Sequence, residues 1–325
     1  MAYERELDVA IQAVRKACRL CSGVQYSLLH DDTTSKDDRS PVTVADLGSQ
    51  AVITSELLRS FPEDSIVSEE DANVLRDNEY IARRVLGLVN EQIGGMAASQ
   101  LLEALDYGAR TTYRTIRFWT VDPIDGTKGF LRGEQYAIAL ALVEGGKVVL
   151  GVLGCPNLPW TDGGSEENRG GVYFAVKGQG AFVQTMDQSV ERSISVDSLA
   201  LSAEARFCES VEEGHVSHEN HARISSILGI TTPPYRIDSQ CKYAVVARGD
   251  ASIYPRLSST KDYRDAIWDH AAGSIIVMEA GGQVTDSRGE PLDFAAGRRL
   301  ANNSGIVATN GKLHQQVIAA IAQAV

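Results

Sequence analysis

Long apolar runs are absent from this sequence. No stretch approaches the roughly 20 consecutive apolar residues that a membrane-spanning helix requires, so no membrane partner is expected. The first ten residues, MAYERELDVA, contain acids and no apolar segment of the kind found in secretory signals. They are also unlike the Arg-rich, acid-poor start of a transit peptide. We therefore expect a cytoplasmic protein.

Cysteine is scarce, with five residues spread along 325 positions. An odd and scattered set does not predict a disulfide framework. Cys18 and Cys21 have the spacing of a zinc or redox pair, but no second pair follows at metal-ligand spacing and the segment has a helical pattern. We interpret them as buried structural thiols. The phosphate-binding pattern G-x-x-x-x-G-K-[ST] is also missing, which argues against a kinase of that class.

Positive charge is in the minority. The chain has 31 Lys and Arg against 43 Asp and Glu, which gives a formal net charge of −12. A chain this acidic does not bind nucleic acid through bulk charge. The 43% of hydrophobic and 23% of charged residues are ordinary globular values and exclude general disorder. At roughly 100–200 residues per domain, the length suggests about two domains.

Helical and strand patterns alternate along the chain, which indicates a layered α/β (α+β) fold. Helices are predicted at 7–21 and 44–59, within 72–112, and starting near 218, 240, 268 and 312. Strands are predicted at 65–67, 117–121, 136–143, 148–153, 171–176, 180–183, 206–208, 235–237 and 251–254. The polar stretch 184–202 is the candidate boundary between an N-terminal α+β domain, 1–190, and a C-terminal α/β domain, 191–325.

Acidic residues at the ends of apolar strands are the most informative feature. Asp122 and Asp125 directly follow a predicted buried strand. Pro123 fixes its own φ and pushes Asp122 into an extended conformation, and Gly126 permits a tight turn. Two carboxylates held this close repel each other unless a cation lies between them, and such hard oxygen ligands suit Mg²⁺. The alternative is an Asp-rich turn that caps the following helix.

Three further acidic positions occur in similar places. Glu69 and Glu70 follow another predicted strand, where a solvated acidic run is the alternative. Asp46 stands three residues after Thr43 at the start of a predicted helix, which also fits a capping box. Asp269 is expected in the first turn of a helix, where the macrodipole favours an acid in any case. Because these acids recur together in this order, we favour one shared site.

The combination of motifs is a family signature. This sequence resembles the lithium-sensitive, magnesium-dependent phosphatase superfamily of inositol monophosphatase in Val-Ala-Asp at 44–46, Glu-Glu at 69–70, Asp-Pro-Ile-Asp-Gly-Thr at 122–127 and Trp-Asp-x-Ala-Ala-Gly at 268–273. Within it, the 3′(2′),5′-bisphosphate nucleotidases are the most similar group, in the stretches 36–46, 122–133, 238–243 and 267–273. The resemblance spans nearly the whole chain. It implies an αβαβα sandwich of the inositol monophosphatase and fructose-1,6-bisphosphatase type in two subdomains, with the site between them.

The resemblance implies a role for each acid. The family's ligands for two to three Mg²⁺ ions match Glu69, Asp122, the carbonyl of Ile124, Asp125 and Asp269, with Glu70 holding a weaker third ion through water. Asp46 and Thr127 match the pair that orients and deprotonates the attacking water. These roles fit the chemistry, because a phosphate monoester repels hydroxide and its catalyst must neutralise charge and aim the water in line.

Other positions match the nucleotide contacts of the subfamily, namely Thr127, His215, Ser239, Lys242, Arg256 and Asp269. Lys242 and Arg256 are expected at the phosphate that is not cleaved, or at the base. His215, His218 and His221 also have a spacing that suggests a metal site. That spacing is better explained by one helix face near a surface turn, so only His215 is retained as a substrate residue. Lys128, beside the metal loop, is expected to be an electrostatic neighbour of the phosphate.

The resemblance therefore predicts a Mg²⁺-dependent phosphoric monoester hydrolase of sulfur assimilation. It would convert adenosine 3′,5′-bisphosphate to AMP and phosphate, and Li⁺ would inhibit it. 3′-Phosphoadenosine 5′-phosphosulfate is a second candidate substrate. The alternatives are an inositol monophosphatase, an inositol polyphosphate 1-phosphatase, or a catalytically idle nucleotide-binding sensor. The segment 239–242 with Arg256 favours a nucleotide over an inositol phosphate, and the water-activating pair argues against a sensor. No obligate protein partner is implied.

Overall fold

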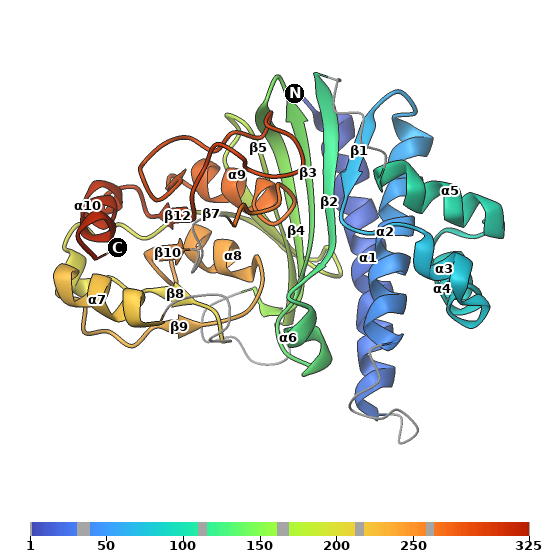
Figure 1. Ribbon diagram of the computed structural model, residues 1–325, viewed down its shortest axis with the longest axis horizontal. Helices are drawn as coiled ribbons and strands as arrows, with labels where there is room; N and C mark the ends of the chain where they lie inside the picture. The colour runs from blue at the N-terminus through green and yellow to red at the C-terminus, as the bar shows by residue number, and fades with distance from the viewer. Residues whose placement is uncertain are drawn as a thin grey trace.

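The computed structural model describes residues 2–30, 40–109, 116–160, 169–211, 218–257 and 263–324. Its helices and strands form five layers that alternate α, β, α, β, α, with the larger sheet between two helical layers (Figure 1). None of the helices in these ranges is long and apolar enough to cross a membrane.

The larger sheet has seven strands that lie side by side in chain order. They are β1 (Ser65–Ser68), β2 (Arg117–Asp125), β3 (Ala137–Glu144), β4 (Lys147–Pro159), β5 (Arg169–Val176), β6 (Ala181–Thr185) and β7 (Glu191–Ile194). β1 and β2 run parallel, whereas each later strand is antiparallel to its neighbour. Along β3, Ile138 and Leu140 belong to one core and Ala139 and Ala141 to another, because successive side chains of a strand point to opposite faces. Both faces of the sheet are therefore covered.

One face of this sheet is covered by α1 (Glu4–His30) and α2 (Ser40–Ser60). The helix α1 buries an apolar stripe that includes Ala10, Val14 and Cys21. Three shorter helices, α3 (Asn73–Asp77), α4 (Glu79–Ile93) and α5 (Ala98–Ala109), follow on the outer side, where α4 and α5 pack against α2. The side chain of Asn78 caps α4 by accepting a hydrogen bond from the backbone N–H of Ile81.

The opposite face is covered by α8 (Cys241–Ala247) and α9 (Ala271–Glu279), whose buried side chains form a second core with the sheet. Beyond them lies a three-stranded sheet of β10 (Ile253–Arg256), β12 (Ile306–Thr309) and β11 (Gln283–Thr285). The helices α7 (His218–Leu228) and α10 (His314–Ala324) form the outermost layer around a third core. The remaining elements are the short helix α6 (Thr127–Leu131), a 3₁₀ turn at Ser202–Glu204, and the paired strands β8 (Cys208–Glu209) and β9 (Tyr235–Arg236).

Most of the predicted elements are present. The stretch predicted as helical, 72–112, contains α3, α4 and α5, and all five cysteines are free and buried, which confirms the structural interpretation of Cys18 and Cys21. The polar stretch 184–202 contributes β7 to the larger sheet. The division into domains at 190 and 191 stays a prediction.

Two local predictions were wrong. The helix α2 begins at Ser40 and not near Val44, so Asp46 lies inside the helix and Thr43 does not begin a capping box. The helix α9 begins at Ala271 after the cap residue His270, so Asp269 lies in the turn before the helix and not in its first turn. Both acids are thus placed by the fold and not by a helix-capping role.

Candidate active site

The end of β2 carries the first group of site residues. Asp122 is only 2% exposed, and the pairing with β3 is irregular between Asp122 and Asp125, where the strand leaves the regular ladder. Gly126 has a φ of 88°, and a Cβ there would lie 2.8 Å from the Cβ of Ser239. Only glycine meets both demands, because it tolerates positive φ and has no Cβ. The chain can therefore turn from β2 into α6 at Gly126, while Ser239, in the segment just before α8, packs directly against that turn.

The alternative of a helix-capping turn is not supported. The cap residue of α6 is Gly126, which makes no side-chain cap hydrogen bond. The Asp125 carboxylate instead accepts a hydrogen bond of 2.6 Å from the backbone N–H of Gln240, just before α8. Asp125 therefore links the larger sheet to the opposite half of the molecule.

Glu69 and Glu70 follow β1, the parallel neighbour of β2. Ser68 pairs with Val121, so the residues after each strand emerge at the same edge of the sheet. Gln50 on α2 holds Glu70 through both backbone groups: its amide donates to the Glu70 carbonyl at 2.7 Å and its oxygen accepts from the Glu70 N–H at 2.9 Å. Ser49 donates to the carbonyl of Pro123 at 2.9 Å. One turn of α2 thus fixes both acidic loops beside Asp46.

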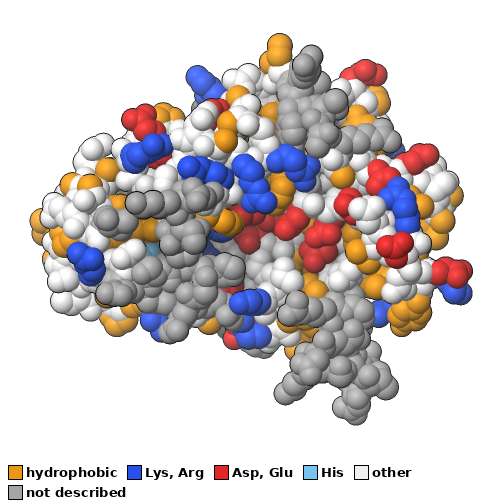
Figure 2. Space-filling view, viewed as in Figure 1, with side chains coloured by type: hydrophobic (Ala, Val, Ile, Leu, Met, Phe, Trp, Pro, Cys, Tyr) orange, Lys and Arg blue, Asp and Glu red, His pale blue; other side chains and the backbone are white. Residues whose placement is uncertain are grey.

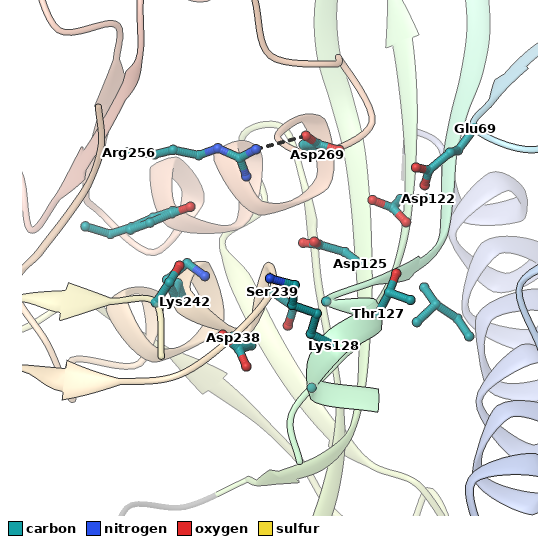
Figure 3. A pocket seen from close by; sticks show the side chains of 15 residues that line it. Glu69, Asp122, Asp125, Thr127, Lys128, Asp238, Ser239, Lys242, Arg256 and Asp269 are labelled. Atoms are coloured by element: carbon teal, nitrogen blue, oxygen red, sulfur yellow. Dashed lines mark hydrogen bonds and ion pairs between the residues drawn. The ribbon is translucent and has the colours of Figure 1, made fainter. Parts of the chain in front are cut away.

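Asp269 reaches the same place from the other half of the molecule. Gln240 donates to the Trp268 carbonyl at 2.9 Å and accepts from the Gly273 N–H at 3.3 Å, which anchors the turn before α9. Asp269 accepts from Arg256 at 3.3 Å (Figure 3).

These residues surround a cavity of about 340 Å³. Of the residues predicted from the sequence, those that line it are Glu69, Asp122, Ile124, Asp125, Thr127, Lys128, Ser239, Lys242, Arg256 and Asp269. Ser210, Asp238 and Tyr254 line it as well. Figure 2 shows acidic side chains gathered in a hollow near the middle of this face, with Lys and Arg side chains on either side of it. His215 lies outside the described residues.

Asp46 and Glu70 do not line this cavity in the described part of the chain, but their charges interact with that of Glu69, which does. Burial first, and then the charges of Glu70 and Glu69, raise the pKa of Asp46 well above its usual value. Burial and the charge of Asp71 raise the pKa of Glu70. The two residues therefore add to the acidic field around the cavity.

Three of the acids that line the cavity, Glu69, Asp122 and Asp269, have raised pKa values, so an added cation would favour their ionisation. Burial, followed by the charges of Asp269 and Glu70, raises the pKa of Glu69 to about 7. Burial and the charges of Glu69 and Asp125 raise the pKa of Asp122 well above normal. The pKa of Asp269 is also raised, mainly by burial, although Arg256 and His270 oppose the shift. The site is built to receive positive charge.

Two cations lie on the other side of the cavity (Figure 3). Lys242 is 5% exposed; its ammonium donates to the Ile237 carbonyl at 3.3 Å and lies 5.4 Å from the centre of the Tyr254 ring. Burial lowers the pKa of Lys242, against the opposing charge of Asp125. Arg256 pairs with Asp265 at 2.9 Å as well as with Asp269. Burial acts to lower the pKa of Arg256, but Tyr254 and these two carboxylates outweigh it and raise the pKa.

A sequence profile of the inositol monophosphatase family matches residues 2–325. The chain belongs to this family. A 3′(2′),5′-bisphosphate nucleotidase of Emericella nidulans is 44% identical and covers 99% of this chain and 98% of its own. Proteins of the same name from Schizosaccharomyces pombe and Dictyostelium discoideum are 42% and 44% identical, over 99% and 98% of this chain and 96% of each relative.

Solved structures of the inositol monophosphatase family share the fold. The Thermotoga maritima IMPase has a TM-score of 0.65 at 24% identity and covers 98% of both chains. CysQ from Bacteroides thetaiotaomicron has a TM-score of 0.62 at 21% identity, over 95% of this chain and 98% of its own. These likenesses confirm the layered fold that the sequence predicted.

Inositol monophosphatase family members are metal-dependent, and the residues of this chain fit a metal. The donors at the cavity are carboxylate and carbonyl oxygens, the ligands that Mg²⁺ prefers. Asp122 Oδ1 is buried and has no hydrogen-bond partner among the residues that the structure describes, which is costly for a buried polar atom unless a ligand completes it.

Several residues that shape the site were not predicted from the sequence. Ser49 and Gln50 stand three and four residues after Asp46, the helical spacing that places side chains on one face, so the pattern could have indicated them. Asp265 and Tyr243 had no such signal. Tyr243 is hydrogen-bonded to His270 Nδ1 at 2.8 Å, His270 Nε2 lies 3.3 Å from Asp265, and Asp265 holds Arg256. This buried chain of contacts joins segments that are separate in the sequence.

Proposed function

We propose that the chain is a metal-dependent phosphatase that hydrolyses the 3′-phosphate of adenosine 3′,5′-bisphosphate to AMP and phosphate. The observation that carries this proposal is one cavity lined by an acidic cluster and by two cations, the buried Lys242 and the partly buried Arg256. An enzyme that binds a substrate with two phosphates needs a place for the group that reacts and another for the group that stays. The names of relatives at 39–45% identity over nearly the whole chain support the same substrate.

The acidic cluster is the proposed reaction centre. Two Mg²⁺ ions would be held by Glu69, Asp122, Asp125, Asp269 and the Ile124 carbonyl, and a third near Glu70. When bound, Mg²⁺ lowers the pKa of water and offsets the charge of the phosphate. Thr127, which lines the cavity, is proposed to orient the attacking water and take its proton, while Asp46 receives the proton of the Thr127 hydroxyl.

The two cations are proposed to hold the phosphate that is not cleaved. Lys242 is buried, Arg256 is partly buried, and both are fixed by neighbouring groups, so they meet the substrate with little loss of side-chain freedom. Ser239 and His215 are the proposed contacts of the nucleoside. 3′-Phosphoadenosine 5′-phosphosulfate carries an anionic group at the same 5′ position and is the second proposed substrate.

The decisive experiment measures phosphate release from adenosine 3′,5′-bisphosphate with and without Mg²⁺. We expect release only with the metal, inhibition by Li⁺, and a higher kcat/KM than with inositol 1-phosphate or inositol 1,4-bisphosphate. A higher kcat/KM for either inositol phosphate would replace the nucleotide with an inositol substrate.

An active-site variant separates an enzyme from a nucleotide-binding sensor. Asp46→Asn should abolish turnover while nucleotide binding is retained, whereas Asp106→Asn, at a surface ion pair with Arg76, should behave like the wild type. Full turnover in Asp46→Asn would remove Asp46 from the mechanism. Nucleotide binding without turnover in the wild type, with Mg²⁺ present, would favour the sensor.

A further inference from the structure

The acids of the cavity come from two segments that lie far apart in the sequence. Glu69 follows β1, and Asp269 precedes α9, 200 positions further on. Among the charges that raise the pKa of Glu69, that of Asp269 comes first after burial, so the two carboxylates lie near each other and repel. Something in the fold must hold them in place before a metal arrives.

Arg298 contacts the residue before each of these acids. Its Nη2 donates to the carbonyl of Ser68, which directly precedes Glu69. Its guanidinium lies 4.7 Å from the ring centre of Trp268, which directly precedes Asp269. A planar guanidinium can stack on an aromatic ring while its edge donates hydrogen bonds, and a lysine cannot do both. Arg298 therefore joins the two halves at the residues that carry the acids.

The surroundings of Arg298 leave it little freedom. Its carbonyl accepts a hydrogen bond of 3.1 Å from the N–H of Ile267, and the next residue, Arg299, forms a β-bridge with Ala266. The Nη1 atom of Arg298 lies 3.5 Å from the carbonyl oxygen of Gly108 on α5. The backbone of Arg298 is thus tied to the segment that carries Asp269, while its side chain reaches the N-terminal half.

The receiving side is equally constrained. Ser68 is fully buried, and a Cβ at Gly108 would lie 1.9 Å from the Ser68 hydroxyl oxygen, so α5 packs directly on this residue. With β2 on one side and α5 on the other, the Ser68 carbonyl has a fixed position. A movement of Arg298 would consequently change the distance between the segments that carry Glu69 and Asp269.

We propose that Arg298 is a positioning residue that sets the separation of Glu69 and Asp269 and thereby the affinity of the site for its metal. This inference rests on the metal-binding part of the proposed function. Residues outside the ligand shell that orient metal ligands typically contribute 10–100-fold to metal affinity. Arg298 would contribute in this way without touching metal or substrate.

The test measures Mn²⁺ binding directly, in the absence of substrate. The electron paramagnetic resonance signal of the free ion reports how much Mn²⁺ is unbound. We expect Arg298→Ala to weaken binding about 10–100-fold, and Arg298→Lys to weaken it as well, because lysine keeps the charge but not the geometry. Arg299→Ala is the matched control, since this exposed neighbour donates only to the Arg264 carbonyl, at 3.2 Å, in the described contacts. It should bind Mn²⁺ like the wild type.

Kinetics provides a second readout that a general loss of stability would not reproduce. At temperatures well below unfolding, Arg298→Ala should need about 10–100-fold more Mg²⁺ for half-maximal activity, while the KM of the nucleotide at saturating Mg²⁺ stays within about twofold. Wild-type Mn²⁺ affinity in both Arg298 variants, or equal weakening in Arg299→Ala, would overturn the role of Arg298 alone. No Mn²⁺ binding by the wild type would overturn the metal site itself, and with it both proposals.

Discussion

The two sides of the cavity differ in how their charges are balanced. On the acidic side, Glu69 and Asp122 have raised pKa values because burial and like charges oppose their ionisation. On the basic side, Arg256 is paired with Asp265 and Asp269, and Lys242 contacts a carbonyl and an aromatic ring. The cations of the basic side therefore have partners within the protein, whereas the acidic side needs added cations to offset its charge. Two fixed cations beside an acidic cluster suit the proposed substrate with two phosphates and the proposed metal cofactor.

Loss of an acid from the acidic side should have the largest effect. Asp122→Asn keeps the size of the side chain but removes a carboxylate whose Oδ1 atom has no hydrogen-bond partner within the described ranges. We expect kcat/KM to fall more than about a hundredfold, since a lost ligand should cost more than a lost outer contact. Mn²⁺ binding should weaken in parallel. The control is Asp250→Asn, a largely buried acid that pairs with Arg248 instead of facing the cavity. Comparable losses in both variants would contradict a special role for the acidic side.

Loss of a cation from the basic side should affect substrate binding and leave metal binding intact. Lys242→Met preserves the buried aliphatic chain and removes the ammonium. Because hydrogen bonds to charged groups contribute about 1.5–3 kcal/mol, the KM for adenosine 3′,5′-bisphosphate should rise about 10–100-fold. The same variant assayed with 3′-AMP, which lacks the second phosphate, provides the comparison. An equal rise in KM for both substrates would show that Lys242 does not recognise that phosphate.

The smallest effect, about tenfold, is expected from pH. Metal binding requires ionised carboxylates, and the pKa of Glu69 is raised to about 7. Metal affinity should therefore increase as pH rises through 7, by about tenfold between pH 6 and pH 8 if one proton is released. Calorimetric titration with Mg²⁺ at the two pH values would measure it. An affinity that does not change with pH would contradict proton competition at the acidic side.

The metal-free protein should show the opposite trend in its free energy of unfolding. A carboxyl group whose pKa is raised in the folded state holds its proton up to about pH 7, while the unfolded chain releases it above about 4.5. The folded state therefore binds more protons in this window, and its stability falls as pH rises from 4.5 to 7. Thermal melting with and without Mg²⁺ should show the metal adding more stability at pH 8 than at pH 6.

Much of the site could be predicted from the sequence because its acids stand in short local motifs. Asp122, Asp125 and Thr127 follow one strand, and a strand that ends in such a turn presents them together whatever the rest of the fold does. Glu69 could be added because it follows a neighbouring strand. The predictions that failed concerned helix ends: Thr43 seemed to begin a capping box and Asp269 to lie in a first turn, but the helices α2 and α9 begin elsewhere. Tertiary packing decides such boundaries more than the local pattern does.

The sequence by itself determined the chemistry of this protein, since the residue types and spacing of its motifs indicate a family and a cation-requiring acidic site. Tertiary structure decided how the parts meet. The backbone N–H of Gln240 donates to the Asp125 carboxylate, Asp265 pairs with Arg256, and Arg298 joins the Ser68 and Trp268 segments. These contacts depend on distances between segments far apart in the chain, and no local pattern of residues records such distances. The net charge of −12 is a property of the sequence, but the meeting of several acids at one cavity is a property of the fold.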